Sequence, residues 1–165
     1  MFKQTLCFIK RQDEILMLNR EKAPTKGLWN GVGGKMEQGE TPLECVIREV
    51  KEETGIDITK NQTKYKGVIT WEVDKIHFGG LYVFLVDIHN DFIYQTPKMV
   101  DEGILDWKRI SWLFGEKNFG EGEMLPHFLP TILNNSSVLE HKCTLENNRL
   151  MGYEFKKIEL VEEIK

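Results

Sequence analysis

The sequence has few cysteines and no long apolar run. Its 165 residues contain 3 cysteines, Cys7, Cys45 and Cys143, with no CxxC pair among them. This number and spacing favour reduced thiols packed as small apolar side chains, as in a cytoplasmic protein, over a disulfide framework or a cysteine zinc site. No run of about 18 apolar residues is present, so no transmembrane helix and no membrane partner are expected.

A strong charge of one sign is also missing. Lys and Arg together number 22 against 26 Asp and Glu, which gives a net charge of -4. Proteins that hold long nucleic acid neutralise its phosphates with excess positive charge, so no long nucleic-acid partner is expected. A small anionic substrate fits this balance if a metal ion offsets the repulsion from acidic groups. The opening segment, 1–10, alternates apolar and polar residues and lacks a signal peptide's apolar core, which favours a cytoplasmic location.

The chain shows no internal repeat, low-complexity segment or evident linker, and its length suits one domain. Apolar runs over 5–9 and 15–18 predict an opening β-hairpin. Further elements are expected as strands over 65–73, 76–88 and 105–110, a helix over 128–133, and a closing hairpin over about 138–160 that turns at Asn147-Asn148. Strands interleaved with helices predict an α/β domain with helices flanking a mixed sheet.

One helix carries explicit start and stop signals, after a glycine-rich loop over 26–39. Thr41-Pro42-Leu43-Glu44 is a capping box with proline at the first helical position. Gly55 predicts a left-handed cap at the other end. The apolar residues between these caps recur at helical spacing and should pack on the sheet; they are Leu43, Val46, Ile47 and Val50.

Three carboxylates share one face of this helix, because Glu49, Glu52 and Glu53 lie at i, i+3 and i+4. Like charges at these spacings destabilise a helix by roughly a few tenths of a kcal/mol per pair. Taken alone, the three residues fit a solvated acidic face. Converging oxygen ligands are also what Mg²⁺ or Mn²⁺ requires, and a bound ion would remove the repulsion.

The residues around these carboxylates favour the metal site. Gly34 is followed after five residues by Glu40, and after seven more by Arg48-Glu49-Val50-Lys51-Glu52-Glu53-Thr54-Gly55-Ile56. Over 34–56 this resembles the Nudix box, GX5EX7REUXEEXGU, at every fixed position, where U is a bulky aliphatic residue. The resemblance implies one Nudix hydrolase domain over 1–165, an α/β/α sandwich with a mixed central β-sheet. It also implies hydrolysis of a nucleoside diphosphate linked to another moiety, with Mg²⁺ or Mn²⁺.

The resemblance implies roles for the box residues. Glu49, Glu52 and Glu53 would bind the metals, with help from the backbone carbonyl of Gly34. Glu40 and Arg48 would pair with each other and hold the loop against the helix, and Gly55 is structural. The metals would neutralise the diphosphate and lower the pKa of an attacking water.

One further carboxylate is expected from outside the box. Glu102, five residues before Trp107, is the candidate, as a metal ligand or as the general base. The alternative for Glu102 is a solvated loop residue. Which of Glu52, Glu53 and Glu102 acts as the general base stays open.

The resemblance extends to MutT-homologue enzymes, which destroy oxidised purine triphosphates such as 8-oxo-dGTP. The loop over 27–35, with Asn30 and Lys35, is similar to theirs, in which an Asn at the position of Asn30 reads the purine edge. Asn30 is equally compatible with a turn. Trp71, within 68–72, is similar to an aromatic that stacks on their base, and the alternative is an ordinary packed aromatic. The closing hairpin over 143–159 is similar in pattern and length.

The stretch over 119–126 departs from those enzymes, which carry an aromatic followed by neighbouring acids before an apolar-Pro pair. Phe119, Glu121 and Glu123 supply an aromatic and two acids, but with a different spacing and acid type. We expect them to take part in base recognition, because a buried purine edge needs paired donors and acceptors. For Phe119 the alternative is an ordinary core or surface aromatic.

Three functions are compatible with these residues. The first is Mg²⁺-dependent hydrolysis of a purine nucleoside triphosphate such as 8-oxo-dGTP to the monophosphate and pyrophosphate. The second is the same chemistry on ADP-ribose, a nucleotide sugar, a dinucleoside polyphosphate or capped RNA. The third, a non-catalytic nucleotide-binding module, is disfavoured because every box carboxylate is present. Each requires a small-molecule nucleotide as partner, and the chain is equally compatible with a monomer or a homodimer.

Overall fold

The computed structural model describes residues 1–159 and 164, and its strands form one mixed sheet. In chain order the elements are β1 (Thr5–Arg11), β2 (Glu14–Arg20), β3 (Trp29–Asn30), α1 (Pro42–Thr54), β4 (Thr63–Val73), β5 (His77–Asp87), β6 (Lys98–Val100), β7 (Gly103–Arg109), α2 (Ile110–Leu113), α3 (Leu125–Asn134), β8 (Leu139–Glu146) and β9 (Arg149–Lys157).

The sheet runs in the order β6-β7-β2-β1-β5-β4-β8-β9, with β3 paired to β2. The β1–β5 and β4–β8 pairs are parallel and the other strand pairs are antiparallel. Because β2 pairs with both β1 and β7, its last residue, Arg20, lies opposite Gly103 at the β6–β7 turn. This register brings residues far apart in the sequence to one edge of the sheet.

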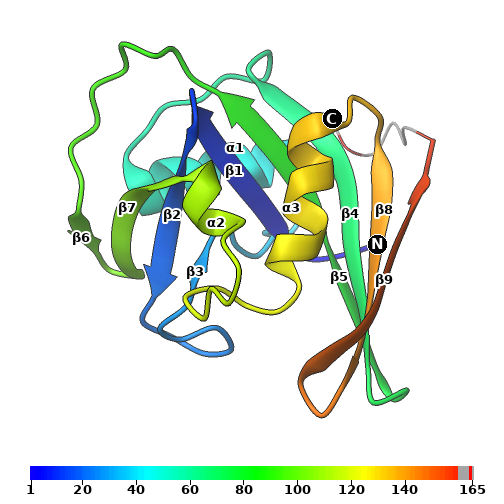
Figure 1. Ribbon diagram of the computed structural model, residues 1–165. Helices are drawn as coiled ribbons and strands as arrows, with labels where there is room; N and C mark the ends of the chain where they lie inside the picture. Colours follow the sequence, from blue (N-terminus) through cyan, green and yellow to red (C-terminus); the bar gives the residue numbers. More distant parts are fainter. Residues whose placement is uncertain (160–163, 165) are drawn as a thin grey trace.

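Helices cover both faces of the sheet (Figure 1), so the predicted α/β/α sandwich with a mixed sheet is confirmed. Strand β1 is buried on both sides, because alternate side chains point to opposite faces. Cys7 and Ile9 join the core against α1, whereas Leu6 and Phe8 join the core against α3. Two apolar clusters therefore lie on opposite faces of the sheet, and they pack α1 on one face and α3 on the other.

The predicted helix with its capping box is present as α1. The Thr41 hydroxyl accepts from the Glu44 backbone N–H, the Glu44 carboxylate accepts from the Thr41 backbone N–H, and Gly55 has φ 77°. The opening hairpin is β1–β2, the strands over 65–73 and 76–88 are β4 and β5, and the closing hairpin is β8–β9. Its turn residues, Asn147 and Asn148, adopt φ of 50° and 61°.

Several predicted boundaries differ from the structure. The helix predicted over 128–133 is α3, which starts earlier, at Leu125, because Pro126 suits the first turn of a helix. Strand β7 begins at Gly103, where pairing to β2 extends it beyond the predicted apolar run. The short elements β3, β6 and α2 were not predicted, since two to four residues carry no periodicity. Leu160, the last residue of the predicted hairpin, lies outside the described residues.

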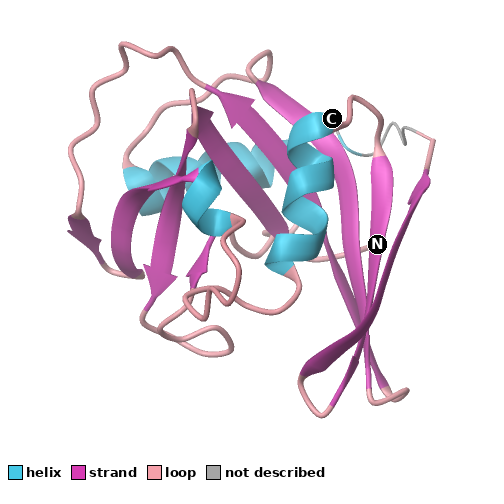
Figure 2. Ribbon diagram, in the orientation of Figure 1, coloured by secondary structure: helices cyan, strands magenta, loops and turns pink. Residues whose placement is uncertain are grey.

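The long hairpins β4–β5 and β8–β9 extend together beyond the body of the sandwich (Figure 2). Their tips are tied to each other, because Asp74 N donates to Leu145 O at 2.9 Å and Asn147 N donates to the Asp74 carboxylate at 2.8 Å. Among the described residues, no helix is long and apolar enough to cross a membrane.

Candidate active site

The last turn of α1 places a carboxylate under the glycine-rich loop. Glu53 is 5% exposed, and its carboxylate accepts a hydrogen bond of 2.8 Å from Gly33 N. The loop can approach this closely because Gly33 has φ 148°, and a Cβ at Gly33 would lie 2.3 Å from Thr5 O. The loop backbone is therefore wedged between strand β1 and the acidic face of α1.

Gly34 makes the same approach possible for a second carboxylate. A Cβ at Gly34 would lie 2.3 to 2.4 Å from the carboxyl atoms of Glu49, so only glycine leaves room for that group. The Gly34 carbonyl accepts from Thr5 N at 2.9 Å. The Cys45 thiol, a weak donor 3.9 Å away, also faces the Gly34 carbonyl.

Arg48 connects the loop to the helix through a network of ion pairs. Its guanidinium donates to both oxygens of Glu40 at 2.8 and 2.9 Å, in the bidentate geometry that arginine and carboxylate favour. Hydrogen bonding to Arg48 is the main reason that the pKa of Glu40 is lowered. Arg48 also donates to Glu49 and Glu52, each at 2.9 Å, and to the Lys35 carbonyl. The exposed Lys35 thus anchors the loop through its backbone.

Glu53 is electrostatically coupled to the turn that carries Glu102. Burial raises the pKa of Glu53 to about 7, and the nearby charges of Glu49 and Glu102 raise it further, while Arg20 and the bond from Gly33 act in the opposite direction. The turn is positioned by β2, because Glu21 N donates to Glu102 O at 2.9 Å. Carboxylates from α1 and from the β6–β7 turn therefore face one region of space.

The donors present fit a hard divalent cation. Carboxylate and carbonyl oxygens are the ligands that Mg²⁺ and Mn²⁺ prefer. In the part of the chain that the structure describes, no three His, Cys, Asp or Glu side chains are grouped as an ion would require. The reason is that Arg48 draws the Glu49 and Glu52 carboxylates to itself, whereas Glu53 bonds to the loop. Glu52, with its side chain 58% exposed, is the carboxylate freest to turn.

A different buried acid lies in the loop before α3, next to strand β3. Glu121 is 6% exposed, and both of its carboxylate oxygens lack a hydrogen-bond partner among the described residues. Burial raises the pKa of Glu121 to about 7. An unpaired buried carboxylate is costly, so a hydrogen-bond partner from outside the described residues would stabilise Glu121.

Strand β3 runs beside this loop and carries the aromatic Trp29 and the polar Asn30. Trp29 N donates to Gly120 O at 2.7 Å, and Trp29 forms a parallel bridge with Glu121. The Lys108 ammonium lies 4.1 Å above the Trp29 ring. Asn30, half-buried next to Trp29, uses its side-chain carbonyl to accept from Gly31 N at 2.8 Å, which leaves its amide N–H groups available.

The other residues predicted to read a base are more scattered. Trp71 is half-buried on β4, and its indole lies flat against Gly79, where a Cβ would be 2.4 Å away. Phe119 is 86% exposed and contacts no core cluster. Glu123 is exposed and accepts a hydrogen bond from Leu150 N in the closing hairpin. The structure places Trp29, the neighbour of Asn30 on β3, next to Glu121 and leaves Phe119 in solvent.

Comparison with known proteins decides the family. A model described as the NUDIX domain matches residues 3–128, about three quarters of the chain. The chain belongs to the Nudix family. The glycine loop, the capped helix and the ion-pair network all lie within the matched residues.

Relatives of this Nudix chain carry different names. An uncharacterized Nudix hydrolase of Bacillus subtilis is 34% identical over 108 residues, which is 65% of each chain. An 8-oxo-dGDP phosphatase of Mus musculus is 47% identical over 49 residues, 30% of this chain and 15% of the mouse protein. An ADP-ribose pyrophosphatase of Methanocaldococcus jannaschii is 46% identical over 48 residues, 29% of this chain and 28% of that protein. The matches therefore span less than two thirds of these relatives' own lengths.

Among solved structures, a MutT protein from Bacillus halodurans is similar with a TM-score of 0.73 and 25% identity. The likeness covers 94% of this chain and 98% of that one. Since the NUDIX model ends at residue 128, this similarity is what extends the family resemblance to the closing hairpin.

Two basic residues that the sequence did not single out lie in this region, Arg20 near Glu53 and Lys108 beside the base loop. Arg20 lies close enough to Glu53 to lower its pKa, and its Nε is buried without a partner among the described residues. Lys108 lies between Trp29 and Trp112, at 4.1 and 5.4 Å from the two ring centroids. Neither belongs to a motif. Only the β2–β7 register, which no local pattern reveals, brings them to the site.

Proposed function

We propose that this Nudix protein is a Mg²⁺-dependent pyrophosphohydrolase of purine nucleoside triphosphates, with an oxidised purine such as 8-oxo-dGTP preferred. The products are the nucleoside monophosphate and pyrophosphate. The observation that carries the substrate proposal is Glu121, a buried carboxyl group with no partner among the described residues, beside Trp29 and Asn30. The box carboxylates carry the proposal for the chemistry.

At the metal end, Glu49, Glu52, Glu53 and Glu102, with the Gly34 carbonyl, would hold Mg²⁺ or Mn²⁺. When bound, such ions neutralise the diphosphate and lower the pKa of an attacking water. The Arg48–Glu40 pair keeps the glycine-rich loop against α1, where Gly33 N also donates to the Glu53 carboxylate. The Gly34 carbonyl and the Glu53 carboxylate therefore stay close to each other. Arg20 adds positive charge next to Glu53, where a negatively charged phosphate chain would pass.

At the base end, the protonation of Glu121 determines what it recognises. A neutral carboxyl group offers one donor and one acceptor, whereas an ionised one only accepts. With a pKa of about 7, Glu121 can present its neutral form to a purine edge that offers both an N–H and a carbonyl. Asn30 adds amide donors from β3, while Trp71, Phe119, Glu123 and the Lys35 loop are proposed to complete the substrate contacts.

The named relatives support hydrolysis of a nucleotide and divide over the substrate. One is an 8-oxo-dGDP phosphatase and another an ADP-ribose pyrophosphatase. The second candidate function is therefore hydrolysis of ADP-ribose or of another nucleoside diphosphate derivative at the same carboxylates. The unpartnered Glu121 supports a purine as the base, because a purine edge offers a donor and an acceptor side by side to a neutral carboxyl group. Adenine, with N1 and the N6 amino group, meets this requirement as well as an oxidised guanine does, so the choice between the two candidates rests on the resemblance of the loop over 27–35 to MutT-homologue enzymes.

In the test, the purified protein is incubated with Mg²⁺ and one of four nucleotides, and the products are identified by mass. The nucleotides are 8-oxo-dGTP, dGTP, ADP-ribose and diadenosine tetraphosphate. We expect 8-oxo-dGMP and pyrophosphate at the highest kcat/KM. Asn30→Ala should lower the ratio of kcat/KM for 8-oxo-dGTP to kcat/KM for ADP-ribose about tenfold. The control Asn61→Ala, in the exposed turn before β4, should leave this ratio unchanged. Efficient cleavage of ADP-ribose alone would contradict the base proposal and leave the metal end standing.

A further inference from the structure

The ammonium group of Lys108, on β7, lies between two tryptophan rings. It is 4.1 Å from the ring centroid of Trp29 on β3 and 5.4 Å from that of Trp112 on α2. At such distances the face of an aromatic ring attracts a cation. We name Lys108, Trp29 and Trp112 the tryptophan clamp. The clamp holds β3 to β7 and α2, which follow it far along the chain.

An ion pair fixes the position of the Lys108 ammonium. Lys108 donates to one oxygen of the Asp106 carboxylate at 2.9 Å, and the Thr96 hydroxyl donates to the other at 2.7 Å. Burial acts to raise the pKa of Asp106, but the two hydrogen bonds outweigh it and the pKa is lowered. The side chains of Lys108 and Asp106 are only 22% and 27% exposed. The charge between the rings is therefore partly shielded from water, which strengthens its attraction to them.

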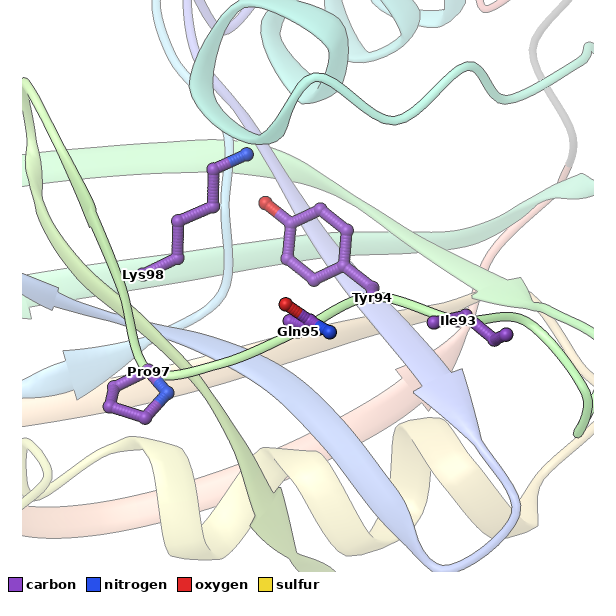
Figure 3. A pocket seen from close by; sticks show the side chains of 5 residues that line it. All are labelled: Ile93, Tyr94, Gln95, Pro97 and Lys98. Atoms are coloured by element: carbon purple, nitrogen blue, oxygen red, sulfur yellow. The ribbon is translucent and has the colours of Figure 1, made fainter.

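Thr96 belongs to the connecting segment between β5 and β6, which is itself anchored. In the same segment Tyr94 reaches toward α1 and helps to line a recess of about 480 Å³ (Figure 3). The Tyr94 hydroxyl donates to Thr54 O at 2.6 Å, and the Trp107 indole N–H donates to Tyr94 O at 3.1 Å. The segment that presents Thr96 to the ion pair is thus fastened both to α1 and to β7.

The tryptophan clamp holds the loop that carries Glu121. Trp29 N donates to Gly120 O at 2.7 Å. The Trp112 indole lies against Gly120, where a Cβ would be 3.1 Å from the ring. The backbone carbonyl of Trp112 also accepts from the Asn118 side chain at 3.0 Å, and that side chain accepts from Gly120 N at 2.9 Å. The residue before Glu121 is therefore held by both tryptophans.

The Glu121 carboxyl group depends on this hold. Both of its oxygens lack a hydrogen-bond partner among the described residues. Burial is what raises its pKa. The position of the carboxyl group is therefore set by the backbone of its loop, and the clamp fixes that backbone at Gly120.

We propose that Lys108 is a positioning residue for base recognition. By attracting both rings of the clamp it holds Gly120 in place, and so it fixes where the Glu121 carboxyl group meets the base. Lys108 acts through Trp29 and Trp112 and needs no contact of its own with the nucleotide. This inference rests on the proposed function, and it extends the control of selectivity to a residue outside the Nudix box.

The experiment replaces Lys108 by Met, which keeps the length of the side chain and removes its charge. Lys108→Met should raise the KM for 8-oxo-dGTP about tenfold and change kcat less than about twofold, because only the base end is disturbed. Lys108→Arg should restore the KM, since a guanidinium group also stacks on tryptophan and pairs with a carboxylate. Lys64→Met is the matched control. Lys64 likewise donates to a carboxylate, that of Asp87 at 2.8 Å, on strands away from the clamp.

A second readout does not need turnover. The Glu121 carboxyl group can be titrated by NMR of the carboxyl carbons, with Glu121→Gln identifying its signal. In Lys108→Met the pKa of Glu121 should fall from about 7 to below about 6, because the released loop admits water to the carboxyl group. In Lys108→Arg and Lys64→Met it should keep the wild-type value. If Lys108→Met does not fold, Lys108→Gln replaces it, since its amide can still donate to Asp106.

The inference stands only if the loss of charge at Lys108 moves both the KM and the pKa of Glu121, and Lys108→Arg restores both. Any other combination overturns it, including a loss of kcat as large as the rise in KM. If the wild type cleaves no purine nucleoside triphosphate, the proposed function fails instead. The titration of Glu121 then decides by itself whether Lys108 positions this group.

Discussion

The two ends of the candidate site are built in opposite ways. At the metal end, almost every polar group has a partner: Arg48 alone makes hydrogen bonds to three carboxylates and a carbonyl. At the base end, Glu121 is buried with both oxygens unpaired among the described residues, and Phe119 stands 86% in solvent. Arg48 satisfies most of the metal end, where Arg20 Nε is the buried exception among the described residues, whereas the base end leaves both Glu121 oxygens without a partner.

This difference teaches how chemistry and selectivity are separated in the molecule. Most of the metal end lies on one helix and its adjoining loop, where Arg48 and Gly33 make contacts close in sequence, and Glu102 and Arg20 reach it from the β6–β7 turn and β2. The base end joins β3, the loop before α3 and the tip of the closing hairpin, so its geometry depends on distant segments. Changes at the first should abolish turnover, and changes at the second should alter the choice of substrate.

The largest effect is expected at Glu53. Glu53→Gln should lower kcat about a thousandfold, because the amide replaces a charged metal ligand in the buried last turn of α1. The fold should persist, since the amide oxygen can still accept from Gly33 N. Steady-state kinetics with Mg²⁺ and thermal unfolding test both statements, with the exposed Glu37→Gln as the control. Near-normal turnover by Glu53→Gln would remove Glu53 from the metal site.

A pair of glycine substitutions compares the two ends directly. At Gly34 a Cβ would displace the Glu49 carboxylate, whereas at Gly122, in the base loop, it would meet nothing within 4 Å. Gly34→Ala should lower kcat/KM about a hundredfold and weaken activation by Mg²⁺. Gly122→Ala should change kcat/KM less than about twofold. Equal effects of the two substitutions would show that the ends are not separated.

Glu121→Gln should affect selectivity and the pH dependence of stability. Its pKa rises from an ordinary 4.5 to about 7 in the folded state, so the folded chain binds more protons between those values. The contribution of Glu121 to the free energy of unfolding is therefore fully present below pH 4.5 and is lost as the pH rises through 7. The loss is on the order of 2 kcal/mol.

The substitution should therefore flatten the free energy of unfolding between pH 4.5 and 7.5, as measured by urea titration. It should also reduce the preference for 8-oxo-dGTP about tenfold or more, because the carboxyl donor is lost. An unchanged pH profile would mean that Glu121 is hydrated or paired when the protein is in solution.

The smallest effect is expected at Phe119. Because its side chain packs on no core cluster, Phe119→Ala should leave the melting temperature within about one degree of the wild type. The KM for 8-oxo-dGTP should rise about threefold if the ring covers the bound base. A loss of stability would show that Phe119 packs inside the molecule, and an unchanged KM would remove it from the base contacts.

The sequence predicted most of the fold, because its main elements carry local signals. The capping box at Thr41 and the left-handed Gly55 mark both ends of α1, and Asn147-Asn148 marks the closing turn. The boundaries that differed are set by partners instead. Strand β7 starts at Gly103 because β2 offers a pairing edge there, and no property of residues 103–104 announces it.

Prediction of the site followed the same division. Glu40, Arg48 and the three helix carboxylates were predicted from their spacing together with the family resemblance. The structure confirms the Arg48–Glu40 pair, and metal binding by the carboxylates stays a prediction. Arg20 and Lys108 could not be found, since a basic residue at a strand end resembles any other until the sheet register is known. Arg48 itself was predicted to pair with Glu40, but its simultaneous hold on Glu49 and Glu52 follows from side-chain reach that spacing does not specify.

The bond from Leu150 to Glu123 gives the closing hairpin a role beyond completing the sheet. The NUDIX match ends at residue 128, yet β8 and β9 reach back and fasten the acidic loop that precedes α3. A chain cut after residue 128 would keep α1 and lose this fastening. If the acidic loop contacts the base as proposed, exchanging the hairpin between relatives would change base preference and leave the box carboxylates of α1 untouched.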